Sequence, residues 1–185
     1  AKIIKQRNPK VVVELGSWLG LSTCDIARKL SSDAKVYAVD HWELLPSHKA
    51  ESLHFKDSTL KAELKKYDCL STLYHQFLSN VIHENLFQKI IPLKMTTRKG
   101  ALQLQKKGIE IDLIYVDADH ETDAVYQDIC DWYPLLSAKG IMCGDDWYMK
   151  SVRIAVKQFA KENNLLIDYK TVGKQISFWQ FFKNV

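Results

Sequence analysis

Glycine and proline are scarce in this chain of 185 residues, which contains seven glycines and four prolines. Chain breakers this rare exclude a low-complexity or collagen-like sequence, and each glycine therefore becomes a marker for a turn. Long blocks of like charge are also lacking and the formal net charge is only +4, so we expect no nucleic-acid partner. No apolar run approaches the roughly 20 residues that cross a bilayer, so we expect no membrane partner.

Cysteine is sparse too, and its spacing carries no metal-binding motif. The four cysteines, Cys24, Cys69, Cys130 and Cys143, form no C-x-x-C pair and have no zinc-like histidine spacing. A chain of this length can bury a hydrophobic core without disulfide bonds, so such cysteines are typical of reduced thiols in a cytoplasmic protein. The length and the hydrophobic content of 46% fit a single globular domain over residues 1–185.

Hydrophobic patterning predicts alternating strands and helices. Apolar or β-branched runs predict strands over residues 11–15, 35–40, 89–93, 111–116 and 140–143, and two closing strands over 165–171 and 175–182. Helical spacing predicts helices over residues 20–30, 56–66, 72–84, 98–107, 122–136 and 151–162, with a loop or insertion over 41–56. This alternation is typical of an α/β fold, a mostly parallel sheet with helices on both faces, here ending in a β-hairpin. Pro92 favours an edge position for the strand that contains it.

The first predicted strand ends in a loop with two glycines. Gly16 and Gly20 lie in the segment ELGSWLG (residues 14–20), directly before a predicted helix. Glycine lets the backbone turn tightly and approach a ligand closely, while the helix offers free N–H groups and the positive end of its dipole. Since ligands of open α/β sheets bind beyond the carboxyl ends of the strands, this loop is a candidate ligand site.

Two carboxylates strengthen this interpretation. Asp40 ends the second strand, 20 residues after Gly20, where an acid can accept hydrogen bonds from both hydroxyls of a ribose. Glu14 ends an apolar strand, where a carboxylate is costly unless it meets a partner, and the cationic end of a ligand is one candidate. The alternative is a structural turn with a solvated acid at the strand end.

At these residues the chain resembles the class I S-adenosylmethionine-dependent methyltransferases, and among them the branch of macrocin-type sugar O-methyltransferases and cephalosporin-hydroxylase-like proteins. The matching stretches are VVVELGSWLG, VYAVDHW, IDLIYVDADH and WYPLLSAKGIMCGDDW. The resemblance implies a Rossmann-like methyltransferase fold, with a seven-stranded sheet whose last strand is antiparallel. It also implies S-adenosylmethionine as the cofactor.

The resemblance further implies where the cofactor binds. The glycine loop would hold its amino-acid end, and Asp40 would hold its ribose. His41 and Trp42 would lie beside the adenine, opposite residues 95–97. The cofactor-binding residues implied are Glu14, Gly16, Ser17, Gly20, Asp40, His41, Thr97 and Asp117.

Three acidic residues follow the ends of two strands that the fold makes neighbours. Asp117 follows the strand over 111–116, and Asp145 and Asp146 follow the strand over 140–143. In the metal-dependent O-methyltransferases that this pattern resembles, three such positions hold Mg²⁺. Carboxylates suit a hard divalent cation, and crowded acids repel one another unless a cation or proton intervenes. The alternatives are a solvated turn at Asp145 and Asp146, or an Asp117 that serves the cofactor pocket without a metal.

His120 is the best candidate for a catalytic base, because its unperturbed pKa lies near neutrality. Asp117 is the second catalytic candidate, as a ligand of a metal that would acidify the acceptor hydroxyl. A surface or helix-capping role is the alternative for His120. Asp119 could also be the base, but we favour it as the N-cap of the helix that begins near Glu121.

Aromatic residues divide into two predicted groups. Trp147 and Tyr148 follow the acidic pair and could wall an acceptor pocket together with His41 and Trp42. The remaining candidates lie in helix or strand settings that favour core packing. This second group is Trp132, Phe178, Trp179 and Phe182.

The sequence therefore predicts a methyltransferase that acts on an oxygen of a small hydroxylated acceptor, such as a sugar or natural-product scaffold, with or without Mg²⁺. One alternative is a cofactor-binding protein of the same fold without that activity, a binding protein or hydroxylase-like. Another is a nicotinamide-dependent oxidoreductase, which would need a glycine where Trp18 stands, and Trp18 would crowd a pyrophosphate. The sequence carries no signal for an oligomeric state, and a homodimer is compatible with it.

Overall fold

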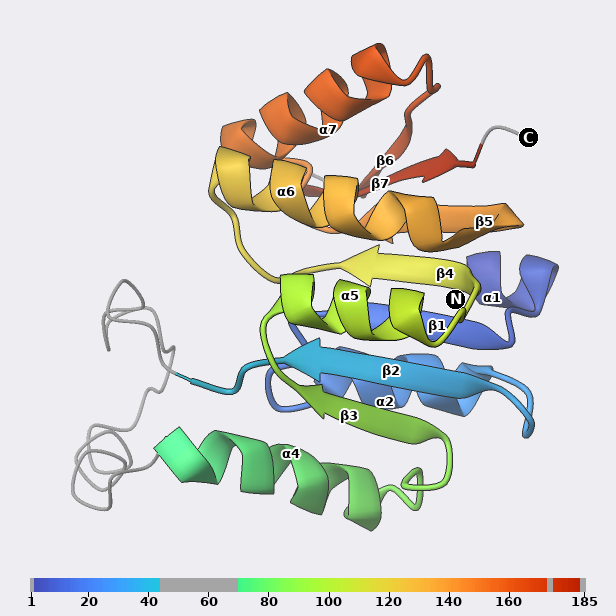
Figure 1. The fold of residues 1–185 in the computed structure, drawn as a ribbon, viewed down its shortest axis with the longest axis vertical. Helices are drawn as coiled ribbons and strands as arrows, with labels where there is room; N and C mark the ends of the chain where they lie inside the picture. The colour runs from blue at the N-terminus through green and yellow to red at the C-terminus, as the bar shows by residue number, and fades with distance from the viewer. Residues whose placement is uncertain (1, 44–69, 173–174, 184–185) are drawn as a thin grey trace.

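The computed structural model describes residues 2–43, 70–172 and 175–183, whose strands form one seven-stranded sheet in the order β3-β2-β1-β4-β5-β7-β6 (Figure 1). The strands are β1 (Val11–Leu15), β2 (Lys35–Asp40), β3 (Ile90–Lys94), β4 (Ile111–Val116), β5 (Leu136–Gly144), β6 (Asp168–Val172) and β7 (Gln175–Phe182). The helices are α1 (Lys2–Arg7), α2 (Leu21–Lys29), α4 (Leu70–His83), α5 (Thr97–Lys106), α6 (Thr122–Trp132) and α7 (Lys150–Glu162), with a 3-10 turn, η1 (Tyr133–Leu135). This is the predicted Rossmann-like α/β architecture.

Strand direction follows the predicted pattern. Strands β3, β2, β1, β4 and β5 pair in parallel, while β7 runs antiparallel to both β5 and β6. The closing hairpin is therefore confirmed. β3 lies at the sheet edge, as Pro92 predicts, because proline has no N–H to donate to a neighbouring strand.

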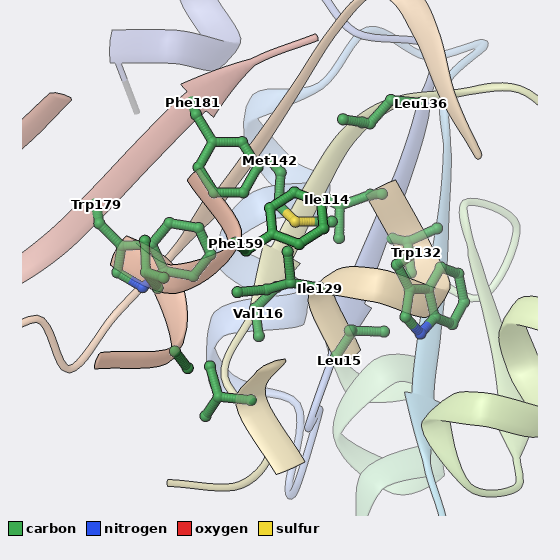
Figure 2. Packing of buried hydrophobic residues seen from close by; sticks show 14 of the residues in the cluster. Leu15, Ile114, Val116, Ile129, Trp132, Leu136, Met142, Phe159, Trp179 and Phe181 are labelled. Atoms are coloured by element: carbon green, nitrogen blue, oxygen red, sulfur yellow. The ribbon is translucent and has the colours of Figure 1, made fainter. Parts of the chain in front are cut away.

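Helices cover both faces of the sheet, and each face has its own hydrophobic core. Side chains alternate along β1, so Val13 and Leu15 pack toward α5, α6 and α7, while Val12 packs toward α1, α2 and α4. In the first core, side chains of the sheet, such as Leu15 and Ile114, share one cluster with Ile129 and Phe159 of the covering helices (Figure 2). Burial on both faces explains why the central strands are continuous apolar runs.

The chain departs from the predicted pattern around Pro134. The helix expected over 122–136 ends at Trp132, and η1 follows, because proline lacks the N–H that a further helical turn needs. β5 then begins at Leu136, earlier than the expected 140–143, and pairs with Ile111 of β4. Residues 137–139, Ser-Ala-Lys, interrupt the apolar pattern, so the sequence does not indicate that the strand begins at Leu136.

Both ends of the chain also differ from expectation. The sequence predicts no element before β1, yet residues 2–7 form α1, with Ile4 buried against the sheet. The strand expected over 165–171 begins only at Asp168, because the N–H of Leu165 donates to the carbonyl of Ala160 and closes the end of α7.

Some predictions lie outside the described residues. They are the helix over 56–66, the part of the loop beyond residue 43, and Cys69. The described cysteines, Cys24, Cys130 and Cys143, have free thiols. Among the described residues, no helix combines the length and the apolar character needed to cross a membrane.

Candidate active site

A cavity of about 430 Å³ opens at the carboxyl ends of β1, β2 and β4. Its size falls in the range of small-molecule sites, roughly 300–1,000 Å³. Five of the predicted cofactor residues line it, namely Gly16, Asp40, His41, Thr97 and Asp117. The other three, Glu14, Ser17 and Gly20, are buried and lie outside its wall.

Gly16 makes the turn after β1. Its φ of +85° is a left-handed conformation that residues with a Cβ rarely adopt. A Cβ at Gly16 would lie 2.0 Å from the carbonyl oxygen of Asp117 and 2.6 Å from the Cα of Ala118. The tight turn is therefore as predicted, and the contact that excludes a Cβ at Gly16 is with the protein's own backbone.

Gly20 closes the same loop and begins α2. Its φ is also +85°, and its N–H donates to the carbonyl of Ser17 at 2.8 Å. A Cβ at Gly20 would lie 2.9 Å from the ring of Phe77 on α4. Both glycines thus let the loop fold tightly against neighbouring elements, and Gly16 also lines the cavity.

Asp40 ties this loop to the end of β2. Its Oδ2 accepts the N–H of Trp18 at 2.8 Å, and its Oδ1 accepts the N–H of Trp42 at 2.6 Å. The indole Nε1 of Trp42 in turn donates to the carbonyl of Trp18 at 2.6 Å. A carboxylate can accept about four hydrogen bonds, so Asp40 keeps capacity for a ligand in the cavity.

The residues after Asp40 have different roles. Trp42 borders the cavity, but its ring is 1% exposed and packs on Tyr74 and Phe77, with ring centroids 4.9 and 4.7 Å away. Trp42 therefore lines the cavity, as predicted, while most of its side chain is buried in the core. His41 remains at the cavity wall, where its Nδ1 accepts the N–H of Glu43 at 2.8 Å.

Glu14 is fully buried beneath the glycine loop. Burial raises the pKa of its carboxyl, and the hydroxyls of Ser22, Thr23 and Ser17 oppose this rise. Thr23 donates to Oε2, whereas Oε1 and the hydroxyl of Ser17 have no partner of good hydrogen-bond geometry in the described part of the chain. A buried acceptor without a donor is costly, so Glu14 retains an unmet demand for a hydrogen bond.

The far end of the cavity lies between α5 and α6, and of its residues only Thr97 is predicted from the sequence. Thr97 on α5 donates its hydroxyl to Oδ1 of Asp128 at 2.5 Å, and both residues line the cavity, as does Asp131. A signal for Asp128 was present in the sequence, because the buried face of α6 consists of Val125, Asp128, Ile129 and Trp132. An acid on an apolar helical stripe needs a partner or a function.

The acidic cluster at the ends of β4 and β5 differs in membership from the predicted one. Ligand atoms of Asp117, His120 and Asp146 lie within 4.8 Å of one another. His120 Nε2 lies 2.7 Å from Oδ2 of Asp146, and its side chain is 45% exposed, so the imidazole is accessible. The structure thus brings two of the three predicted metal ligands together, with the predicted base beside them.

Asp117 connects this cluster to the cavity. Burial raises the pKa of its carboxyl to about 8, and the negative charges of Asp146, Asp145 and Glu14 raise it further. At neutral pH this group therefore holds a proton unless a cation comes near. A carboxyl with a pKa this perturbed, at the edge of a cavity, is typical of a functional site.

Asp145 borders the same turn but is not among the three residues whose ligand atoms lie within 4.8 Å of one another. Its Oδ1 accepts the N–H of Asp146, and its Oδ2 faces the hydroxyl of Tyr115 at 3.5 Å. Asp146 has a φ of +56°, so the chain has already left the strand at this point. The indole of Trp179 stabilises this turn, because its Nε1 donates to the carbonyl of Asp145 at 3.1 Å.

The remaining predictions for this region have mixed outcomes. Asp119 does not cap α6, whose N-cap is Glu121; its Oδ1 instead accepts the N–H of Glu121 at 2.9 Å in the preceding turn. Trp147 is 4% exposed and stacks on Tyr169, so it does not wall a pocket, and Tyr148 is exposed outside the cavity wall.

Among the aromatics predicted to be core residues, Trp132 and Trp179 are wholly buried, which confirms the prediction. Phe178 is partly buried against the second core. Phe182 is 41% exposed and packs beneath the guanidinium of Arg7, so of the predicted core or packing roles it has the packing role and not the core one.

Comparisons with known proteins agree with this geometry. The chain is similar to an O-methyltransferase from Bacillus cereus in complex with S-adenosylhomocysteine, with 18% identity and a TM-score of 0.67 over 98% of this chain and 78% of that chain. It is also similar to TomG from Streptomyces achromogenes, an O-methyltransferase involved in tomaymycin synthesis and solved with S-adenosylmethionine, with 14% identity and a TM-score of 0.67 over 100% of this chain and 77% of that chain. No protein of curated function matches the sequence.

At these identities the structural likeness establishes a common fold. The family assignment comes from the sequence itself, because a family model described as a methyltransferase domain matches residues 13–147, from β1 to the turn after β5. The chain therefore belongs to the methyltransferase domain family, which confirms its resemblance to the class I S-adenosylmethionine-dependent methyltransferases.

Proposed function

We propose that the protein transfers a methyl group from S-adenosylmethionine to an oxygen of a small hydroxylated acceptor, such as a sugar or natural-product scaffold. The observation that carries this proposal is the position of Asp40, on the wall of a cavity of about 430 Å³ and bonded to the loop of Gly16 and Trp18. An acid at the end of the second strand, beside a tight turn after the first, suits a nucleoside whose ribose hydroxyls donate to it.

The residues of the cavity fit this methyl donor at both of its ends. Near the glycine loop, Gly16 and Trp18 line the cavity, and the fully buried Glu14 beneath this loop keeps an oxygen, Oε1, without a partner in the described part of the chain. At the other end, Thr97 and the apolar surface of Met95 and Ala124 border a space for a flat base. The similar structures solved with S-adenosylmethionine or S-adenosylhomocysteine support this choice of ligand.

The reaction forms an oxygen–carbon bond as the carbon–sulfur bond of the sulfonium breaks, and the acceptor hydroxyl loses its proton. We assign that proton to His120. Asp146 accepts a hydrogen bond from Nε2–H of the imidazole at 2.7 Å, which leaves the lone pair on Nδ1 to take the proton. The resulting imidazolium is stabilised by the same carboxylate. Alignment of the acceptor with the methyl group supplies a further large share of the catalysis.

A divalent cation such as Mg²⁺ fits the same site. The carboxylates of Asp117 and Asp146 converge within 4.8 Å, and crowded acids favour a bound cation. We propose that these oxygens hold the ion and that His120 keeps its proton-accepting role, since hard cations prefer oxygen ligands. When bound, the ion would lower the pKa of the acceptor hydroxyl.

Calorimetry with S-adenosylmethionine and S-adenosylhomocysteine tests the donor site. The wild-type protein should bind both at micromolar affinity. Asp40→Asn keeps one acceptor oxygen for the loop but cannot serve both ribose hydroxyls, so its affinity should fall roughly 10-fold or more. Glu110→Ala, an exposed acid before β4, is the matched control and should bind like wild type. Equal affinity in Asp40→Asn would remove the ribose assignment.

A further inference from the structure

The turn after β5 places Asp146 against His120, the base in the proposed reaction. Oδ2 of Asp146 lies 2.7 Å from Nε2 of His120, and Asp146 has a φ of +56°. This left-handed conformation is uncommon for a residue with a Cβ, and it persists only where surrounding contacts hold it. Side chains that hold the turn from outside therefore bear on the geometry of the base.

Trp179 on β7 makes one such contact. The antiparallel pairing of β7 with β5 places Trp179 opposite Gly144, the last residue of β5. A Cβ at Gly144 would lie 2.6 Å from the indole, so the glycine lets the ring pack directly on the backbone of β5. From this position Nε1 of Trp179 donates to the carbonyl of Asp145 at 3.1 Å.

The peptide between Asp145 and Asp146 is therefore held at both of its polar groups. Its carbonyl accepts the indole N–H of Trp179, and its N–H donates to Oδ1 of Asp145 at 2.9 Å. A planar peptide rotates as one unit, and its rotation changes the φ of the residue that follows. A peptide held on both sides therefore keeps Asp146 in the conformation that directs its carboxylate toward His120.

The indole is itself fixed in place. Trp179 is wholly buried in the first core, and its ring lies 5.4 Å from that of Phe181 between centroids. Trp179 also borders the small space that Asp117, His120 and Asp146 share, but it does not line the cavity of about 430 Å³. Its N–H is thus a rigid donor beside the proposed catalytic residues and outside the proposed donor site.

We propose that Trp179 is a positioning residue for the reaction: its indole N–H holds the peptide before Asp146, and Asp146 in turn orients the imidazole of His120. This inference rests on the proposed function, in which Nδ1 of His120 takes the proton of the acceptor. Only the tautomer with its proton on Nε2 leaves Nδ1 free to do so, and the bond to Asp146 selects that tautomer.

Nitrogen-15 NMR of the histidine rings tests this inference without an acceptor. The spectra are recorded near pH 9, above the ordinary imidazole pKa of about 6.5, so that the rings are neutral. In wild type, the shifts of Nδ1 and Nε2 of His120 should be further apart than those of His83, which is exposed at the end of α4. In Trp179→Phe, which loses the N–H, this separation should narrow toward that of His83.

Trp132→Phe is the matched control. Trp132 is also wholly buried in the first core, but its Nε1 has no hydrogen-bond partner within the described residues. Both substitutions remove similar indole area and should lower the free energy of unfolding in urea, yet Trp132→Phe should keep the wild-type separation for His120. Calorimetry should give both variants the wild-type affinity for S-adenosylhomocysteine, because neither residue lines the cavity.

The outcomes separate this inference from the proposed function. A wild-type separation for His120 no wider than that for His83, an unchanged separation in a folded Trp179→Phe variant, or equal narrowing in Trp132→Phe would overturn the role of Trp179. If Trp179→Phe does not fold, Gly144→Ala gives the same test, because the added methyl displaces the indole. Failure of the wild-type protein to bind S-adenosylhomocysteine would instead overturn the proposed function.

Discussion

Replacing Asp128 by asparagine should change how the stability of the protein depends on pH. Burial raises the pKa of this carboxyl to about 6, from 3.8 for an unperturbed aspartate. The hydrogen bond from Thr97 opposes that rise, and the charges of Asp131 and Asp119 add to it. Between these two pH values the native protein therefore binds a proton that the unfolded chain has released.

The sign of the effect follows from the higher native pKa. The carboxyl contributes stability that is fully present below pH 3.8 and is lost as the pH rises through about 6. A difference of about two pKa units corresponds to about 3 kcal/mol, most of which, about 2 kcal/mol, is lost between pH 4 and pH 7. Asparagine keeps an oxygen for Thr97 and does not ionise. The difference in the free energy of unfolding, variant minus wild type, should therefore increase by about 2 kcal/mol from pH 4 to pH 7.

Urea unfolding of the two proteins at several pH values between 4 and 7.5, followed by tryptophan fluorescence, measures this difference. Carboxyl groups remote from Asp128 titrate alike in both proteins and cancel in the comparison, whereas Asp131 and Asp119, whose charges act on Asp128, contribute a smaller difference. Asp123→Asn, exposed on the same helix, should differ from wild type by an amount that does not vary with pH. A pH-independent difference for Asp128→Asn, or one that moves in favour of wild type, would refute the argument from burial.

Three further predictions concern the turn after β5. A Cβ at Gly144 would lie 2.6 Å from the ring of Trp179, so Gly144→Ala should lower the free energy of unfolding by about 1–3 kcal/mol in urea titrations. Arg153 donates to the backbone carbonyls that follow Asp146, so Arg153→Gln should lower kcat for methyl transfer while calorimetry gives an unchanged affinity for S-adenosylhomocysteine. Millimolar Mg²⁺ should raise the Tm of wild type in thermal unfolding but not that of Asp146→Asn, and indifference of both proteins would count against the metal site.

The part of the cavity that we propose for the methyl donor could be predicted from the sequence, because its residues lie next to regular elements. The apolar run before Gly16 and the acid that ends the following strand are local signals, and the parallel sheet brings them together. The sequence could not indicate why Gly16 is glycine, since the contact that excludes a Cβ is with the backbone of Asp117, far along the chain. Hydrophobic periodicity predicts which face of a helix or strand a residue occupies, but not which residue of another element it contacts.

The residues that we propose for catalysis lie in the turns after β4 and β5, where the sequence predicts the direction of side chains less well. Asp145 and Asp146 are adjacent and chemically alike, yet only Asp146, with its positive φ, turns toward His120. Likewise Trp42 follows Asp40 at a position that suits a ligand, but its indole bonds to the Trp18 carbonyl and fills the core. Tertiary contacts determine the direction in which these side chains point, and residue type and spacing do not predict those contacts.

The two halves of the site also differ in what binding must supply. On the donor side, hydrogen bonds among Asp40, Trp18 and Trp42 already fix the wall, so a ligand meets a formed surface and little ordering is needed. On the other side, Asp117 is buried near Asp146, and burial and repulsion raise its pKa to about 8. In the free protein at neutral pH a proton on Asp117 relieves this repulsion, and a positive charge nearby, on a sulfonium group or a divalent ion, would displace that proton. The same raised pKa therefore predicts that binding of a cationic reactant beside Asp117 releases a proton, whereas binding of a neutral competitor does not.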